Sequence, residues 1–121
     1  MLKIQLKIQF NLSIRNEFGN IEGFEINCEE VNDNGNFIFK VIRYIDVYLN
    51  NKISERLVFD ENQIFDSLEK ATDWIKEYIL DESTSLQIYY HEFVRQINLI
   101  FVFIMNTSID VNNEGFDRIF D

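Results

Sequence analysis

The sequence predicts an α+β fold, namely an antiparallel β-meander of four or five strands with one or two amphipathic helices packed on one face. The N-terminal residues alternate strictly between apolar and polar side chains, which is the period of a strand with one buried face. Residues 66–81 carry apolar side chains at the helical period behind a capping pattern. Because the strand-like segments come first and the helix-like segments follow, their order favours α+β over alternating α/β.

The first strand is expected at Leu2–Ile14. Leucine, isoleucine and phenylalanine occupy its even positions, and lysine, glutamine, asparagine, serine and arginine its odd positions. One face should therefore be buried and the other wet and basic. A turn over residues 16–20 leads to a second strand through Phe24, Ile26 and Cys28, with a bulge expected at Gly23.

Two tight turns define the rest of the meander. Asp33-Asn34-Gly35-Asn36 lies between two strand-like runs and is typical of a hairpin. The third strand is expected at Phe37–Leu49, which is rich in Phe, Ile, Val and Tyr. Asn50-Asn51-Lys52 then turns the chain into a fourth strand at Ile53–Phe59.

The first helix is expected from Asp66 to about Asp81. The segment Asp66-Ser67-Leu68-Glu69 has the form of a capping box. An apolar face follows it, with Trp74 on the flank, and should lie on the meander. The members of that face are Leu68, Ala71, Ile75, Tyr78 and Ile79.

The segment after residue 84 has mixed character. A second capping pattern at Thr84–Gln87 and apolar side chains at helical spacing predict a helix over residues 85–98, although the aromatic and β-branched content leaves a strand open. Leu99–Met105 is a dense β-prone run that predicts a buried strand. Residues 107–121 are expected to be a loosely ordered acidic tail.

Composition narrows the function classes. The chain has 121 residues, no proline, 46% hydrophobic and 15% aromatic residues, which predicts a single folded domain over 1–121. The formal charge of −10 argues against nucleic acid or an anionic membrane as a partner. A basic protein partner, a cation or solubility alone are the remaining uses of that charge.

The cysteine count and the apolar runs predict a soluble, cytoplasmic protein. Cys28 is the single cysteine, so no disulfide framework or cysteine metal cluster is expected. Its place in the alternating second strand predicts a small buried residue. The N-terminus lacks the unbroken apolar core of a signal peptide, and Leu99–Met105 is too short to span a bilayer.

No motif predicts catalysis, a cofactor or a metal. Residues of the tail resemble an EF-hand calcium loop in spacing alone, at Asp110, Asn112, Glu114, Gly115 and Asp121. Asp117 stands where that loop has an apolar residue, so calcium binding is not expected. His91 is the single histidine, has no partner for catalysis in the pattern, and is expected at the surface.

The strongest functional pattern is a stripe of carboxylates on the predicted first helix. Glu69, Asp73, Glu77 and Asp81 follow one another at i, i+4 spacing. Like charges at this spacing cost roughly 0.2–0.5 kcal/mol per pair, so the three pairs cost on the order of 1 kcal/mol. Lys70 and Lys76 flank this acidic stripe and offset part of that cost.

Two further acidic clusters lie near predicted turns. Glu29, Glu30 and Asp33 adjoin the first hairpin, and a second group precedes the helix at Asp60, Glu61 and Asp66. Each cluster alone is typical of a solvated rim. Together with the stripe they favour a partner-binding surface, with Trp74 as a buried anchor.

The profile resembles that of bacterial immunity proteins, which block the nuclease domain of a cognate toxin. The likeness is one of class: small, single-domain, acidic, α+β and without catalytic residues. It implies a basic toxin as partner and a monomer or weak homodimer. Three alternatives stay open: a phage-type inhibitor that mimics nucleic acid, a homo-oligomeric scaffold subunit whose first strand pairs with a second copy, and, least supported, an enzyme.

Overall fold

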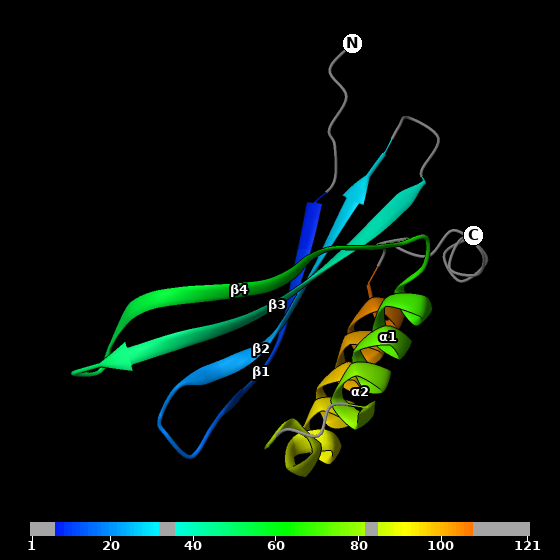
Figure 1. Cartoon of the computed structure of the whole chain (residues 1–121). Coiled ribbons are helices and arrows are strands. Elements are labelled where there is room, and N and C mark those ends of the chain that lie inside the picture. The colour runs from blue at the N-terminus through cyan, green and yellow to red at the C-terminus, as the bar shows by residue number, and fades with distance from the viewer. Residues whose placement is uncertain (1–6, 32–35, 82–84, 108–121) are drawn as a thin grey trace.

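The computed structural model describes residues 7–31, 36–81 and 85–107, without the side chains of 60–62. Four antiparallel strands form one sheet in the order β1-β2-β3-β4, and the two helices lie side by side on one face of it (Figure 1). The predicted α+β meander with helices on one face is thus confirmed, with four strands in the described residues. Their bounds are β1 Lys7–Arg15, β2 Ile21–Glu30, β3 Phe37–Leu49, β4 Lys52–Phe65, α1 Leu68–Asp81, the 3-10 helix η1 Ser85–Tyr89 and α2 Tyr90–Met105.

The alternation of β1 sets the two faces of the sheet. Leu12 and Ile14 are buried, whereas Lys7 and Asn11 are exposed. Cross-strand pairing places the even residues of β1 and β2 and the odd residues of β3 on the helix-covered face. The opposite face has no helix over it (Figure 1). Residues 2–6 of the predicted first strand lie outside the described residues.

Both predicted hairpins are present. Leu49 pairs with Lys52 across a two-residue turn in which Asn50 and Asn51 have φ of +53° and +63°, the left-handed conformations of a type I′ turn. At the other hairpin Glu30 pairs with Phe37, while Asp33-Asn34-Gly35 lies outside the described residues. The fourth strand runs on to Phe65, beyond the expected end, because it stays paired with β3 as far as Phe39.

The bulge expected at Gly23 is wrong. The register of β2 runs without a shift past Gly23 on both sides, and the register shifts lie instead in the β3–β4 pair, at Val41/Arg43 and Val47/Tyr48. Glycine is required for another reason: a Cβ there would lie 1.9 Å from the Leu12 carbonyl oxygen. A close approach of two backbones, and not an extra residue, explains this glycine.

Helix α1 starts later than expected and uses a different cap. The Ser67 hydroxyl accepts a hydrogen bond from the Lys70 backbone N–H at 3.1 Å, which makes Ser67 the N-cap. Asp66, the predicted first residue, instead pairs with the Lys70 ammonium at 2.8 Å. The predicted end at Asp81 is confirmed.

The predicted strand at Leu99–Met105 is wrong, because these residues form the last turns of α2. Burial follows the helical period through Phe93, Ile97, Ile100 and Ile104, which continues the helix predicted over 85–98. The capping pattern at Thr84–Gln87 does not start α2, since η1 precedes it and Tyr89 gives no side-chain cap. Thr84 itself lies outside the described residues.

The core lies between the sheet and the two helices. Phe24, Ile26, Phe39, Ile75 and Phe93 are fully buried there, together with Cys28, as expected. Helix α2 is tied to the edge strand β1 by the Gln96 amide, which bonds the backbone N–H and C=O of Ser13, both at 2.8 Å. In the described part of the chain, no helix has the length and apolar character needed to cross a membrane.

Candidate protein-binding surface

The predicted acidic stripe lies along the exposed side of α1. The stripe carboxylates are all exposed, on the side of the helix opposite its core residues. This arrangement follows from the sequence, because i, i+4 spacing keeps side chains on one face. The exposed stripe residues are Glu69, Asp73, Glu77 and Asp81, and the buried residues of α1 are Leu68, Ala71, Thr72, Ile75 and Ile79.

Ion pairs among the described residues leave the stripe carboxylates without a basic partner. The Lys70 ammonium bonds Asp66 at 2.8 Å, which lowers the pKa of that carboxyl. Among the described residues, no ion pair uses a stripe carboxylate. The last turn of α1 has no basic residue, so Asp81 faces the negative end of the helix dipole. The stripe therefore costs helix stability and projects a negative potential into solvent.

An aromatic flank adjoins the stripe. Trp74 and Tyr78 are half-buried on the side of α1, with ring centroids 5.2 Å apart. Phe24 lies beneath them, 6.4 Å from Trp74 and 5.6 Å from Tyr78, and Phe65 of β4 packs 6.2 Å from Trp74. The two half-buried rings therefore pack against each other and against the aromatic side chains of β2 and β4.

Stripe and aromatic flank meet in a shallow groove of about 570 Å³. Trp74 and Tyr78 line it together with Glu77, Leu80 and Asp81. The structure thus brings Trp74, Glu77 and Asp81 of the predicted site into one surface. Glu69 and Asp73 continue the same stripe toward the start of α1.

Of the hairpin cluster, Glu29 does not join this surface. Glu29 pairs with Lys7 and Ile38 on the sheet face that no helix covers, while the stripe lies on the helical side. Glu30 is the last residue of β2 and pairs with Phe37. Asp33 lies outside the described residues. Glu29 therefore belongs to a different surface from the acidic stripe.

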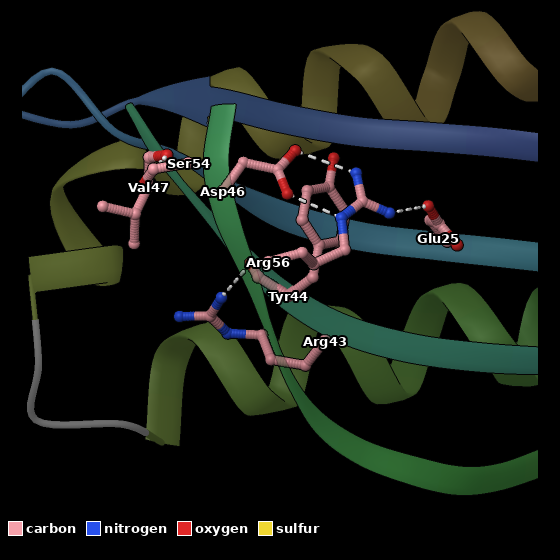
Figure 2. A network of polar contacts seen from close by, with 7 residues as sticks. All are labelled: Glu25, Arg43, Tyr44, Asp46, Val47, Ser54 and Arg56. Carbon is pink, nitrogen blue, oxygen red and sulfur yellow. Dashed lines mark hydrogen bonds and ion pairs between the residues drawn. The ribbon is translucent and has the colours of Figure 1, made fainter. Parts of the chain in front are cut away.

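A polar network on the uncovered sheet face was not apparent from the sequence. Figure 2 shows Arg56 between Asp46 and Glu25: its Nε and Nη2 bond Asp46 at 2.6 and 2.8 Å, and its Nη1 bonds Glu25 at 2.6 Å. The guanidinium carbon lies 4.2 Å from the Tyr44 ring centroid. Asp46 and Tyr44 are almost completely buried beneath it. Burial raises the pKa of Tyr44, and the carboxylates raise that of Arg56.

A second arginine supports the aromatic flank from within. Arg43 Nη2 pairs with Glu22 at 2.9 Å, and its Nη1 bonds the Tyr44 carbonyl at 2.8 Å. The Arg43 guanidinium lies within 6.0 Å of the ring centroids of Phe59 and Tyr78. The strand registers that pair Arg43 with Phe24 and with Phe59 place the guanidinium beside these rings.

The remaining chemistry-bearing residues show no site within the described ranges. His91 is exposed on α2, as expected, and Cys28 is buried. Among the residues that the structure describes, no three His, Cys, Asp or Glu side chains are grouped to hold a metal ion. The calcium-loop residues, from Asp110 to Asp121, lie outside those ranges.

Comparison of the sequence with models of protein families finds no match, and comparisons with curated proteins and with solved structures find none either.

Proposed function

We propose that this chain is a small inhibitor that binds a basic protein partner through the acidic stripe and the groove beside it. The supporting observation is the junction on one helix of four carboxylates, which have no ion pair among the described residues, with a packed aromatic pair. Carboxylates steer a basic partner and fix its orientation. Half-buried Trp and Tyr side chains provide the apolar anchor that dominates binding energy at interfaces.

An immunity-type inhibitor is the form of this function that we favour. A nuclease-type toxin domain is basic because it binds phosphates, so an acidic surface can occupy or cover its substrate site. The stripe is present although it costs α1 on the order of 1 kcal/mol. Such a cost is understandable when the same residues contribute to binding. In this proposal the chain blocks a reaction and catalyses none.

A nucleic-acid mimic is the second candidate. The regular spacing of the stripe favours it, since four helical residues rise about 6 Å and the four carboxylates extend over about 18 Å. That length covers roughly five phosphates of one DNA strand at 3.4 Å each. A mimic should bind several unrelated DNA-binding proteins, whereas an immunity-type inhibitor should bind one.

The test begins with a basic domain encoded beside this chain, or otherwise found to bind it. The association rate is measured at low and high salt for Asp73→Lys/Glu77→Lys. The charge-matched control is Glu17→Lys/Glu55→Lys, because both glutamates are exposed and lie away from α1. We expect the stripe variant to associate at least about tenfold more slowly, within the range of electrostatic steering. The association rate of the control variant should fall only slightly.

Thermal melting checks that both variants are folded, and the stripe variant should melt at the wild-type temperature or slightly above it. Equal association rates for the two variants would contradict the proposal, since total charge alone would then account for binding. A panel of unrelated DNA-binding proteins distinguishes the mimic from the immunity-type inhibitor.

A further inference from the structure

A groove of about 530 Å³ runs between the outer edge of β1 and α2. Its lining includes Ile8 and Phe10 of β1 with Leu99 and Phe103 of α2, and Phe103 packs edge-on against Phe10 at 6.0 Å. No charged residue lines it, although the chain has 21 acidic and 11 basic residues. This surface is separate from the acidic stripe on α1.

The backbone of β1 directs hydrogen-bonding groups outward at this groove. Gln96 binds both backbone groups of Ser13, so these groups point away from β2. Alternation along an antiparallel strand gives the same outward direction to the N–H and C=O of Asn11, Gln9 and Lys7. The β1 edge can therefore accept another strand.

The two edges of the sheet are protected differently. Edge strand β4 carries Lys52, Glu55 and Arg56, the kind of charged side chains that discourage edge-to-edge pairing. Between Lys7 and Arg15, by contrast, β1 carries no charge. A further strand can therefore pair with the β1 edge without burying a charged side chain in the middle of β1.

Helix α2 has more apolar surface than the sheet covers. Leu99, Val102, Phe103 and Met105 are about half exposed, at 48–58%, while the core side of the same helix is fully occupied. The exposed side of a helix in a folded domain is normally polar, so the apolar exposed side of the last turns of α2 indicates a partner there. The apolar residues of this surface are also the reason that the sequence pattern of Leu99–Met105 predicted a buried strand.

We propose that a second copy of this chain binds here, with the two β1 strands antiparallel about a two-fold axis at Gln9. Gln9 then pairs with Gln9, Lys7 with Asn11, and Ile8 with Phe10. The residues whose backbone groups point outward then form hydrogen-bonded pairs. Ile8 and Phe10 form the non-hydrogen-bonded pairs between them, in which the opposing Cα atoms and side chains lie closer together. A two-fold contact is self-complementary, so one surface supplies both the strand edge and the apolar helix side that the other copy requires.

The uncharged lining of the groove permits a second copy despite the acidic charge of the chain. Two copies with a formal charge of −10 repel each other, and they can approach most closely through an uncharged surface. Within the described strand, Lys7–Arg15, an axis at Gln9 sets Lys7 opposite Asn11, whereas an axis at Asn11 would set Lys7 opposite Arg15. Dimerisation should therefore strengthen with added salt, opposite to the binding of a basic partner.

Sedimentation velocity on the full chain from about 5 to 500 µM, at low and high salt, measures this association. Gln9→Pro removes an outward N–H that β2 does not use, and should weaken the dimer at least about tenfold, whereas Gln9→Ala should not. Leu99→Lys provides a second variant that leaves the strand intact. Its control is Leu80→Lys, since Leu80 is similarly exposed on α1. Sedimentation of the wild type as a monomer throughout would overturn the proposal, as would dimers of both Gln9→Pro and Leu99→Lys that are as tight as the wild type.

Cross-linking tests the register. Residues paired across the axis have Cα atoms about 5.5 Å apart, within the range of a disulfide, and Cys28 is buried. Gln9→Cys should therefore form a covalent dimer on mild oxidation, while Asn11→Cys should remain largely monomeric in a denaturing gel. Cross-linking of Asn11→Cys in preference to Gln9→Cys would overturn the proposed axis.

Discussion

Replacement of Gly23 by alanine is expected to be strongly destabilising, because the space for a Cβ is already taken by β1. The added atom would lie 1.9 Å from the Leu12 carbonyl oxygen and 2.8 Å from the Ser13 Cα. Real Cβ contacts essentially never fall below 3.0 Å. Since the obstructing atoms are backbone, β1 must move by more than 1 Å relative to β2.

The size of the effect follows from that displacement. Overpacking of this kind costs typically 1–3 kcal/mol, and two weakened ladder hydrogen bonds add about 2 kcal/mol. The intrinsic gain of alanine over glycine in a strand returns roughly 0.5–1 kcal/mol. A net loss of about 3 kcal/mol corresponds to a melting temperature lower by about 12 °C in a domain of this size.

Thermal denaturation followed by circular dichroism measures the loss, with Gly19→Ala as the matched control. Gly19 has nothing within 4 Å of the added atom, but its φ is +82°, so alanine there should cost only about 1 kcal/mol. A melting temperature of Gly23→Ala within about 4 °C of the wild type, or above that of Gly19→Ala, would refute the steric conflict with β1.

Three further predictions concern titration, reactivity and the polar network. The bonds from Arg95 and Gln96 lower the pKa of Glu92 to about 2, so its stabilising effect should be present above pH 4.5 and lost as pH falls toward 2; an NMR titration of Arg95→Gln should move the Glu92 midpoint back toward 4.5. Burial raises the pKa of Cys28 to about 12, so a thiol reagent should label it only in denaturant, and rapid labelling of the native chain would contradict its buried placement. Arg56→Ala should lower the free energy of unfolding, measured by urea denaturation, by about 2 kcal/mol, because the carboxylate of Asp46 loses a bidentate partner. A loss below about 0.5 kcal/mol would show that this ion pair is as weak as an ordinary exposed one.

Local patterns predicted the parts of the fold that depend on nearby residues. Strict alternation predicted the faces of β1, and the Asn-Asn pair predicted the turn that ends β3 at Leu49. The stripe on α1 was predictable because helical spacing alone places it. Ser67 replaced Asp66 as the cap because both residues suit that position and the choice depends on where the helix meets β4.

Features that depend on pairing between distant segments were not predictable. The Arg56 network joins side chains of β2, β3 and β4, and only the register brings them together. Leu99–Met105 failed for a related reason: its composition indicates burial on all sides, whereas the structure buries one side at Ile100 and Ile104. The apolar content of Leu99–Met105 indicated that this segment would be buried. Only the spacing of its apolar residues could indicate that it is a helix.

The Gln96–Ser13 contact has a consequence for how the chain folds. It joins residues 83 positions apart, so the last described helix secures the first described strand. The hairpins of the meander can form early during synthesis because their contacts are local. The apolar side of β1, however, remains uncovered until α2 has emerged and docked, because α1 packs mainly on β3 and β4. During that interval a nascent sheet with an open β1 edge is exposed to misassembly with neighbouring chains, and the time needed to synthesise α2 sets how long this exposure lasts.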